Sequence, residues 1–146
     1  MNSQLQGTLE TILVVDHHDL VLKTVVEALK GANFRVLWAD SIANAIKIAE
    51  ETNRKIDMLL SDVEMPIMSG PDLGQFLKKS RPYIHVMLMS GGGARGNLLV
   101  LNYGWAYIQK PFVGSKLIEM VTEVLHTKDR SQIGGQQFDC REEPRK

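Results

Sequence analysis

Residues 57–70 read DMLLSDVEMPIMSG, and this stretch carries the pattern from which the fold is best inferred. A continuous apolar run at residues 58–60 leads directly into Ser61 and Asp62, with Glu64 two residues further on. Short continuous apolar runs of this kind are typical of strands that are buried on both faces of a sheet. The stretch therefore predicts a buried strand with acidic groups at its carboxyl end.

Four more apolar runs of the same kind lie on either side, at residues 12–15, 34–38, 84–89 and 106–108. Segments with helical periodicity separate them. Strands that alternate with helices favour right-handed crossovers and a parallel sheet that is covered on both faces. We therefore predict a doubly wound α/β domain with five strands.

The helix ends can also be predicted. Gly31 is placed to end the first helix in a left-handed turn, and Ser41 can cap the second. A third helix is expected at about residues 71–79, and Ser115 is a candidate cap for the last one. The helix expected near residues 95–101 has the weakest pattern.

The composition fits one domain of ordinary size. The chain has 146 residues, of which 44% are apolar and 23% charged, which is globular usage. We expect an N-terminal extension at residues 1–9, a domain at residues 10–127, and a flexible polar tail at residues 128–146.

Charge and cysteine content exclude some functions. Lys plus Arg and Asp plus Glu both number 17, so no overall field attracts nucleic acid or an anionic membrane. Cys140 is the only cysteine, so neither an intrachain disulfide nor a multi-cysteine metal site can form. The first ten residues lack a signal-peptide pattern, and no apolar run approaches roughly 20 residues, so a cytoplasmic protein is expected.

The predicted strand ends carry the reactive residues. In an open parallel sheet, ligands bind beyond the carboxyl ends of the strands. Asp16 follows the first strand, Asp62 ends the third, Ser90 ends the fourth, and Lys110 follows the fifth. Asp62 could act as a nucleophile toward phosphorus, Asp16 could sit near a hard cation, Lys110 could supply a fixed positive charge, and Ser90 could hydrogen-bond an added phosphoryl group. Each residue alone is more typical of a strand-end cap or turn, so the inference depends on their joint placement.

Two strings in the chain resemble those of the response-regulator receiver family of two-component signal transduction, as a stand-alone domain. Residues 57–70 are similar to the family's segment around its phosphorylated aspartate, and residues 107–112 (YIQKPF) are similar to its aromatic switch residue, lysine and following proline. The match runs from about residue 12 to residue 125. It implies a flavodoxin-like sheet with strand order 2-1-3-4-5.

The resemblance also implies a mechanism. A histidine kinase or phosphotransfer protein would phosphorylate Asp62, with Mg²⁺ held by Asp16, Asp62 and the backbone carbonyl of Glu64. Ser90 and Tyr107 would then act as the switch. A downstream protein would bind the face formed by the helix near residues 95–101, the strand at residues 106–108 and the last helix. No contact with nucleic acid or membrane, and no turnover of a separate substrate, is expected.

His17 is the main departure from the family pattern, because a second acidic residue that commonly binds the metal usually stands there. An imidazole should weaken Mg²⁺ binding, favour a softer divalent metal, or leave the domain metal-independent. His17 could equally point to solvent. His18 suggests no role. The segment before Tyr107 is one residue shorter than the commonest family spacing.

Three other functions compete with that of a phosphorylated receiver. The first is a pseudo-receiver, an interaction module that is not phosphorylated because of His17. The second is an aspartate-based phosphatase, but such an enzyme needs a second aspartate where Glu64 stands. The third is a flavodoxin-like electron carrier, for which the segment after the first strand lacks a Ser/Thr-rich phosphate loop.

Overall fold

The computed structural model of the chain describes residues 9–91 and 105–126. Its centre is one sheet of five parallel strands in the order β2-β1-β3-β4-β5. The strands are β1 (Thr11–Val15), β2 (Arg35–Ala39), β3 (Met58–Asp62), β4 (His85–Ser90) and β5 (Ala106–Gln109). The predicted α/β class and strand order are therefore confirmed, with each strand within two residues of its expected bounds.

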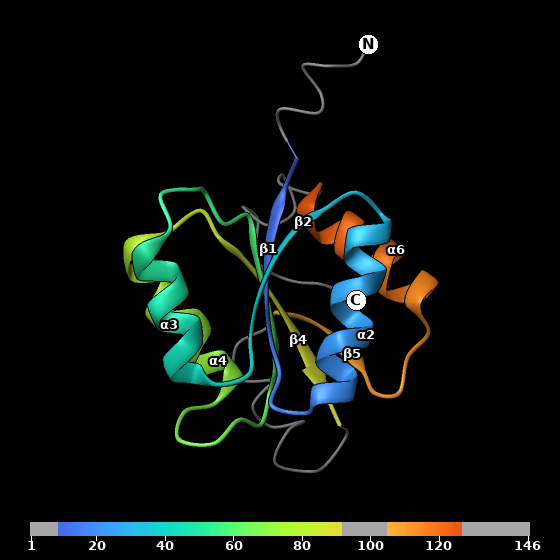
Figure 1. The fold of residues 1–146 in the computed structure, drawn as a ribbon, viewed down its shortest axis with the longest axis horizontal. Coiled ribbons are helices and arrows are strands. Elements are labelled where there is room, and N and C mark those ends of the chain that lie inside the picture. Colours follow the sequence, from blue (N-terminus) through green and yellow to red (C-terminus); the bar gives the residue numbers. More distant parts are fainter. Residues whose placement is uncertain (1–8, 92–104, 127–146) are drawn as a thin grey trace, which may run out of the picture.

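The described helices cover both faces of this sheet (Figure 1). Helices α2 (Asp19–Gly31) and α6 (Gly114–Leu125) pack on one face, and α3 (Ile42–Glu51) and α4 (Gly70–Ser80) pack on the other. This arrangement follows from the parallel connections, each of which must cross over a face of the sheet.

The strands divide their side chains between two cores. In β1, Ile12 and Val14 belong to the core under α2 and α6, whereas Leu13 and Val15 belong to the core under α3 and α4. Successive side chains of a strand point to opposite faces, and in β1 both faces are buried. This is why residues 12–15 of β1 are all apolar and do not alternate with polar residues.

The helix ends agree with the sequence in part. The Ser41 hydroxyl accepts a hydrogen bond from the Asn44 N–H at 3.1 Å, so the predicted cap of α3 is confirmed. The prediction for Ser115 is wrong, because α6 begins at Gly114 and its N-cap is Val113, which makes no side-chain cap. Helix α2 ends at Gly31 as predicted, but the left-handed conformation expected there is wrong, because the left-handed residue is Asn33, with φ 72°. Asn tolerates that conformation because its short side chain can bond locally.

The third predicted helix is confirmed as α4, with Ser69 as a cap that the sequence reading had not named. The helix expected near residues 95–101 lies outside the described residues, as do residues 1–8 and 127–146. Within the described ranges, every helix is too short or too polar to cross a membrane.

Candidate functional site: an acidic pair, one lysine and two histidines

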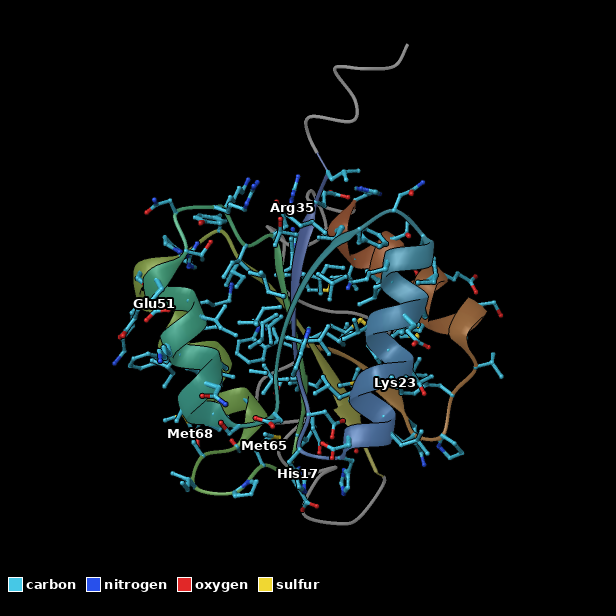
Figure 2. All side chains as sticks on the ribbon, viewed as in Figure 1. His17, Lys23, Arg35, Glu51, Met65 and Met68 are labelled. Carbon is cyan, nitrogen blue, oxygen red and sulfur yellow. The ribbon has the colours of Figure 1, made fainter. Side chains whose placement is uncertain are left out.

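The candidate site lies at the carboxyl end of the sheet. Figure 2 shows His17 at this end, beyond the end of β1 and at the opposite end of the sheet from Arg35. Two backbone hydrogen bonds tie the loops together there: Val63 N–H donates to the Met89 carbonyl at 2.9 Å, and Lys110 N–H donates to the Ser90 carbonyl at 2.7 Å. The residues after β3 and β5 are therefore both held against the end of β4.

Lys110 joins the two buried carboxylates of the site. Its Nζ lies 2.9 Å from Asp16 Oδ2 and 3.5 Å from Asp62 Oδ1. Asp16 is fully buried and Asp62 is 4% exposed. Ionised carboxylates at such depth need a charged or hydrogen-bonding partner, and one ammonium group serves both of them.

The two histidines face the other oxygens of the same carboxylates. His17 Nδ1 lies 3.5 Å from Asp62 Oδ2, and His18 Nδ1 lies 3.2 Å from Asp16 Oδ1. The His18 backbone N–H also donates to Asp16 Oδ1 at 2.9 Å. The imidazole rings lie 4.0 Å apart, centroid to centroid. His17 thus faces the proposed phosphoacceptor, although its side chain stays 34% exposed.

The neighbours of Asp62 shift its pKa in opposite directions. Burial and the negative charge of Asp16 raise the pKa of Asp62 above its ordinary value of 3.8. Lys110 and His17 act in the opposite direction, and their effect is smaller. Desolvation and a like charge both disfavour the ionised form of a carboxyl group. The ionised form of Asp62 is therefore less favourable in the folded protein than in water, and pKa shifts of this kind are typical of functional groups.

The loop after β3 packs tightly against Asp62. A Cβ at Gly70 would come within 2.1 Å of the Asp62 carbonyl oxygen, so only glycine fits there. Ser61 Oγ donates to the same carbonyl at 2.9 Å. Within the loop, Met68 N–H donates to the Pro66 carbonyl, and the intervening Ile67 has φ 79° and is fully exposed. A three-residue turn of this hand is strained for a β-branched residue.

The remaining predicted residues lie on neighbouring strands and loops. Ser90 is buried at the end of β4. Glu64 is exposed two residues beyond Asp62. Tyr107 lies on β5 and is 44% exposed. The peptide bond between Lys110 and Pro111 is cis.

Four side chains form a group that could hold a metal ion. Asp16, His17, His18 and Asp62 each offer one ligand atom, and these atoms all lie within 4.8 Å of one another. The sequence predicts three of the four as metal ligands, and His18 is the residue that it does not predict. Its position directly after His17 was the only available signal, because neighbours along a loop need not point the same way.

The fold and this site together define a class: a doubly wound parallel sheet with an acidic pair and a lysine at its carboxyl edge, which is a receiver domain. Residues 12–122 match the family model described as "Response regulator receiver domain". The chain belongs to this family, whose members act in two-component signalling and pair with histidine kinases.

Relatives agree with this assignment. The chain is 34% identical over 121 residues to "Sensor kinase CckA" of Brucella abortus, covering 82% of this chain and 13% of that one. It is 33% identical over 115 residues to "Transcriptional regulatory protein NatR" of Bacillus subtilis, covering 78% and 48%. The chain thus spans less than half the length of these two curated relatives.

Solved receiver structures match nearly end to end. A response regulator receiver domain protein from Clostridium thermocellum shares 28% identity with a TM-score of 0.73, covering 83% of this chain and 98% of that one. A CheY-like receiver protein from Methanospirillum hungatei shares 26% identity with a TM-score of 0.72, covering 87% and 100%.

Proposed function

We propose that this chain is a phosphoacceptor receiver that takes a phosphoryl group on Asp62 from a histidine kinase or a phosphotransfer protein. The observation that carries the proposal is the position of Lys110, with Nζ 2.9 Å from Asp16 and 3.5 Å from Asp62. One fixed cation beside a buried acidic pair is what an aspartate needs to receive a phosphoryl group.

The transfer breaks the bond between phosphorus and the donor and forms a bond between phosphorus and an Asp62 carboxylate oxygen. The nucleophile must be ionised, and its raised pKa helps it because a more basic carboxylate is a better nucleophile. Lys110, whose Nζ lies 3.5 Å from Asp62 Oδ1, would support the charge of the phosphoryl oxygens. No oxidant or reductant is involved.

A divalent cation bound at the acidic pair would neutralise phosphoryl oxygens. Asp16, Asp62 and the carbonyl of Glu64 are the oxygens that the family resemblance assigns to Mg²⁺. Mg²⁺ prefers oxygen ligands in near-octahedral geometry, and here two imidazoles face the two carboxylates. The donors therefore fit Mg²⁺ poorly, and we expect Mg²⁺ to bind weakly.

The output is proposed to pass through protein contacts. An added phosphoryl group brings negative charge and strong acceptors. Ser90, buried at the end of β4, would move toward it, and Tyr107, half exposed on β5, would turn inward. The surface formed by β5 and α6 would change and present the state to a partner; the helix expected near residues 95–101 lies outside the described residues.

The competing candidate is a pseudo-receiver that is never phosphorylated. The observation in its favour is His17 Nδ1 at 3.5 Å from Asp62 Oδ2, which puts an imidazole against the phosphoacceptor. The two functions differ in acyl-phosphate formation.

Intact-mass analysis after incubation with acetyl phosphate separates them, run with Mg²⁺ and in parallel with Mn²⁺. A receiver gains one labile phosphoryl group, about 80 Da, and the Asp62→Asn variant does not. No gain with either ion, in a protein whose far-UV circular dichroism shows it folded, would favour the pseudo-receiver.

A further inference from the structure

We propose that Asp16, His17, His18 and Asp62 form a site for a transition-metal ion of the zinc class. This inference concerns the same edge of the sheet as the proposed phosphoacceptor and deepens that function by naming the ion. It rests on the geometry of four side chains in the unphosphorylated protein.

The first argument is the spacing of the ligand atoms. In a tetrahedral complex with bonds of about 2.0–2.1 Å, neighbouring ligand atoms lie about 3.3–3.4 Å apart. The His18 Nδ1 to Asp16 Oδ1 distance is 3.2 Å, and the His17 Nδ1 to Asp62 Oδ2 distance is 3.5 Å. Both nitrogen–oxygen pairs therefore have the spacing of one edge of a zinc coordination tetrahedron.

The second argument is the division of the carboxylate oxygens. Lys110 contacts Asp16 Oδ2 and Asp62 Oδ1, whereas the histidines face Asp16 Oδ1 and Asp62 Oδ2. Each carboxylate thus keeps one oxygen for the ammonium group and turns the other toward an imidazole. Outer contacts that orient a ligand in this way are typical of metal sites.

The third argument is charge and ligand type. The two carboxylates carry two negative charges, and the Lys110 ammonium group beside them offsets one, so the site keeps a net negative charge that attracts a divalent ion. Imidazole nitrogen suits zinc, nickel and copper, while magnesium prefers carboxylate, carbonyl and water oxygens. The side chains of His17 and His18 are 34% and 59% exposed, so an ion can reach them from solvent.

Isothermal titration calorimetry on the metal-free full chain tests the site. The protein used in the titration carries the substitution Cys140→Ser, which removes the one thiol that could bind zinc elsewhere. We expect one Zn²⁺ per chain, bound at least tenfold more tightly than Mg²⁺ in the same buffer. His17→Ala and His18→Ala should each weaken Zn²⁺ binding at least tenfold, because each removes a ligand.

The matched control is His126→Ala. His126 is an exposed imidazole that lies 3.1 Å from Glu10, at the other end of the sheet. It should leave Zn²⁺ affinity unchanged. Zinc affinity that falls equally in all three variants, or that falls in none, overturns the proposal, as does Mg²⁺ binding that matches Zn²⁺ binding.

Co²⁺ provides a second readout that does not depend on affinity. A tetrahedral site with imidazole ligands gives intense visible absorption from Co²⁺, while six oxygen ligands give weak absorption. The intense bands should be lost in His17→Ala and kept in His126→Ala. These titrations contain no phosphodonor, so a chain that binds zinc but accepts no phosphoryl group contradicts the proposed function alone. The reverse result contradicts this inference alone.

Discussion

At the scale of single residues, the site is an acidic pair that shares one ammonium group unequally. Lys110 Nζ is closer to Asp16, at 2.9 Å, than to Asp62, at 3.5 Å. Asp62 is therefore the less well compensated carboxylate, in agreement with the direction of its pKa. An ionised carboxylate that is buried with incomplete compensation should lower the stability of the fold.

Asp62→Asn should therefore stabilise the protein at neutral pH. Because the pKa of Asp62 is raised in the folded state, the folded protein binds its proton more readily than the unfolded chain. The contribution of Asp62 to stability is thus fully present below about its ordinary pKa of 3.8 and is lost as pH rises through the folded value. Urea unfolding at pH 7 should show a higher midpoint for Asp62→Asn, and the difference should shrink toward pH 4. A difference that grows on acidification would contradict this.

Gly70 provides a steric test beside the same residue. Gly70→Ala should cost about 1–3 kcal/mol, because its Cβ would lie 2.1 Å from the Asp62 carbonyl oxygen. Gly31→Ala is the matched control, because a Cβ there meets nothing within 4 Å. It should gain about 0.5–1 kcal/mol, since alanine suits a helix better than glycine. Equal changes in the two variants, measured by urea unfolding, would contradict the close approach at Gly70.

At the scale of elements, the helix caps can be tested by a matched pair of serines. Ser41→Ala should cost about 1 kcal/mol, because it removes the acceptor for the Asn44 N–H. Ser115→Ala should change stability by less than about 0.5 kcal/mol, because Ser115 lies inside α6 and does not cap it. Thermal unfolding of both variants checks this. A loss of stability in Ser115→Ala as large as in Ser41→Ala would mean that Ser115 does cap α6.

Elements also show what could be predicted from sequence and what could not. The strands were predictable because a strand that is buried on both faces forms a continuous apolar run, as at residues 12–15 of β1 and 58–60 of β3. The left-handed Asn33 and the strained Ile67 were not, because each conformation is set by how the chain packs. The carboxylate–lysine set followed from strand ends alone, whereas the approach of His18 to Asp16 depends on a loop conformation.

At the scale of the whole molecule, two cores share one sheet. Leu29 lies in the core under α2 and α6, and Leu73 lies in the core under α3 and α4. Every inner strand contributes side chains to both cores, so we expect the two cores to unfold together.

Leu29→Ala and Leu73→Ala should therefore lower the stability of the same single transition, each by about 2–5 kcal/mol. Far-UV circular dichroism follows the whole fold, and the fluorescence of Trp105 follows the core against which it packs. For this experiment every protein carries the substitution Trp38→Phe, because Trp38 is half exposed on β2 and its fluorescence would add to that of Trp105. The two probes should give coincident curves in both variants. Separate curves for Leu29→Ala would mean that the faces unfold independently.

The central claim is that the phosphoryl group is carried by Asp62, although two imidazoles lie beside it. The most direct measurement is to treat the acetyl phosphate-labelled protein with borohydride, which reduces an acyl phosphate to an alcohol, and to sequence the peptides by tandem mass spectrometry. Reduction of the aspartate to homoserine at position 62, and at no other acidic residue, is the predicted result. Phosphate found on His17 or His18, or homoserine at another position, would contradict the account.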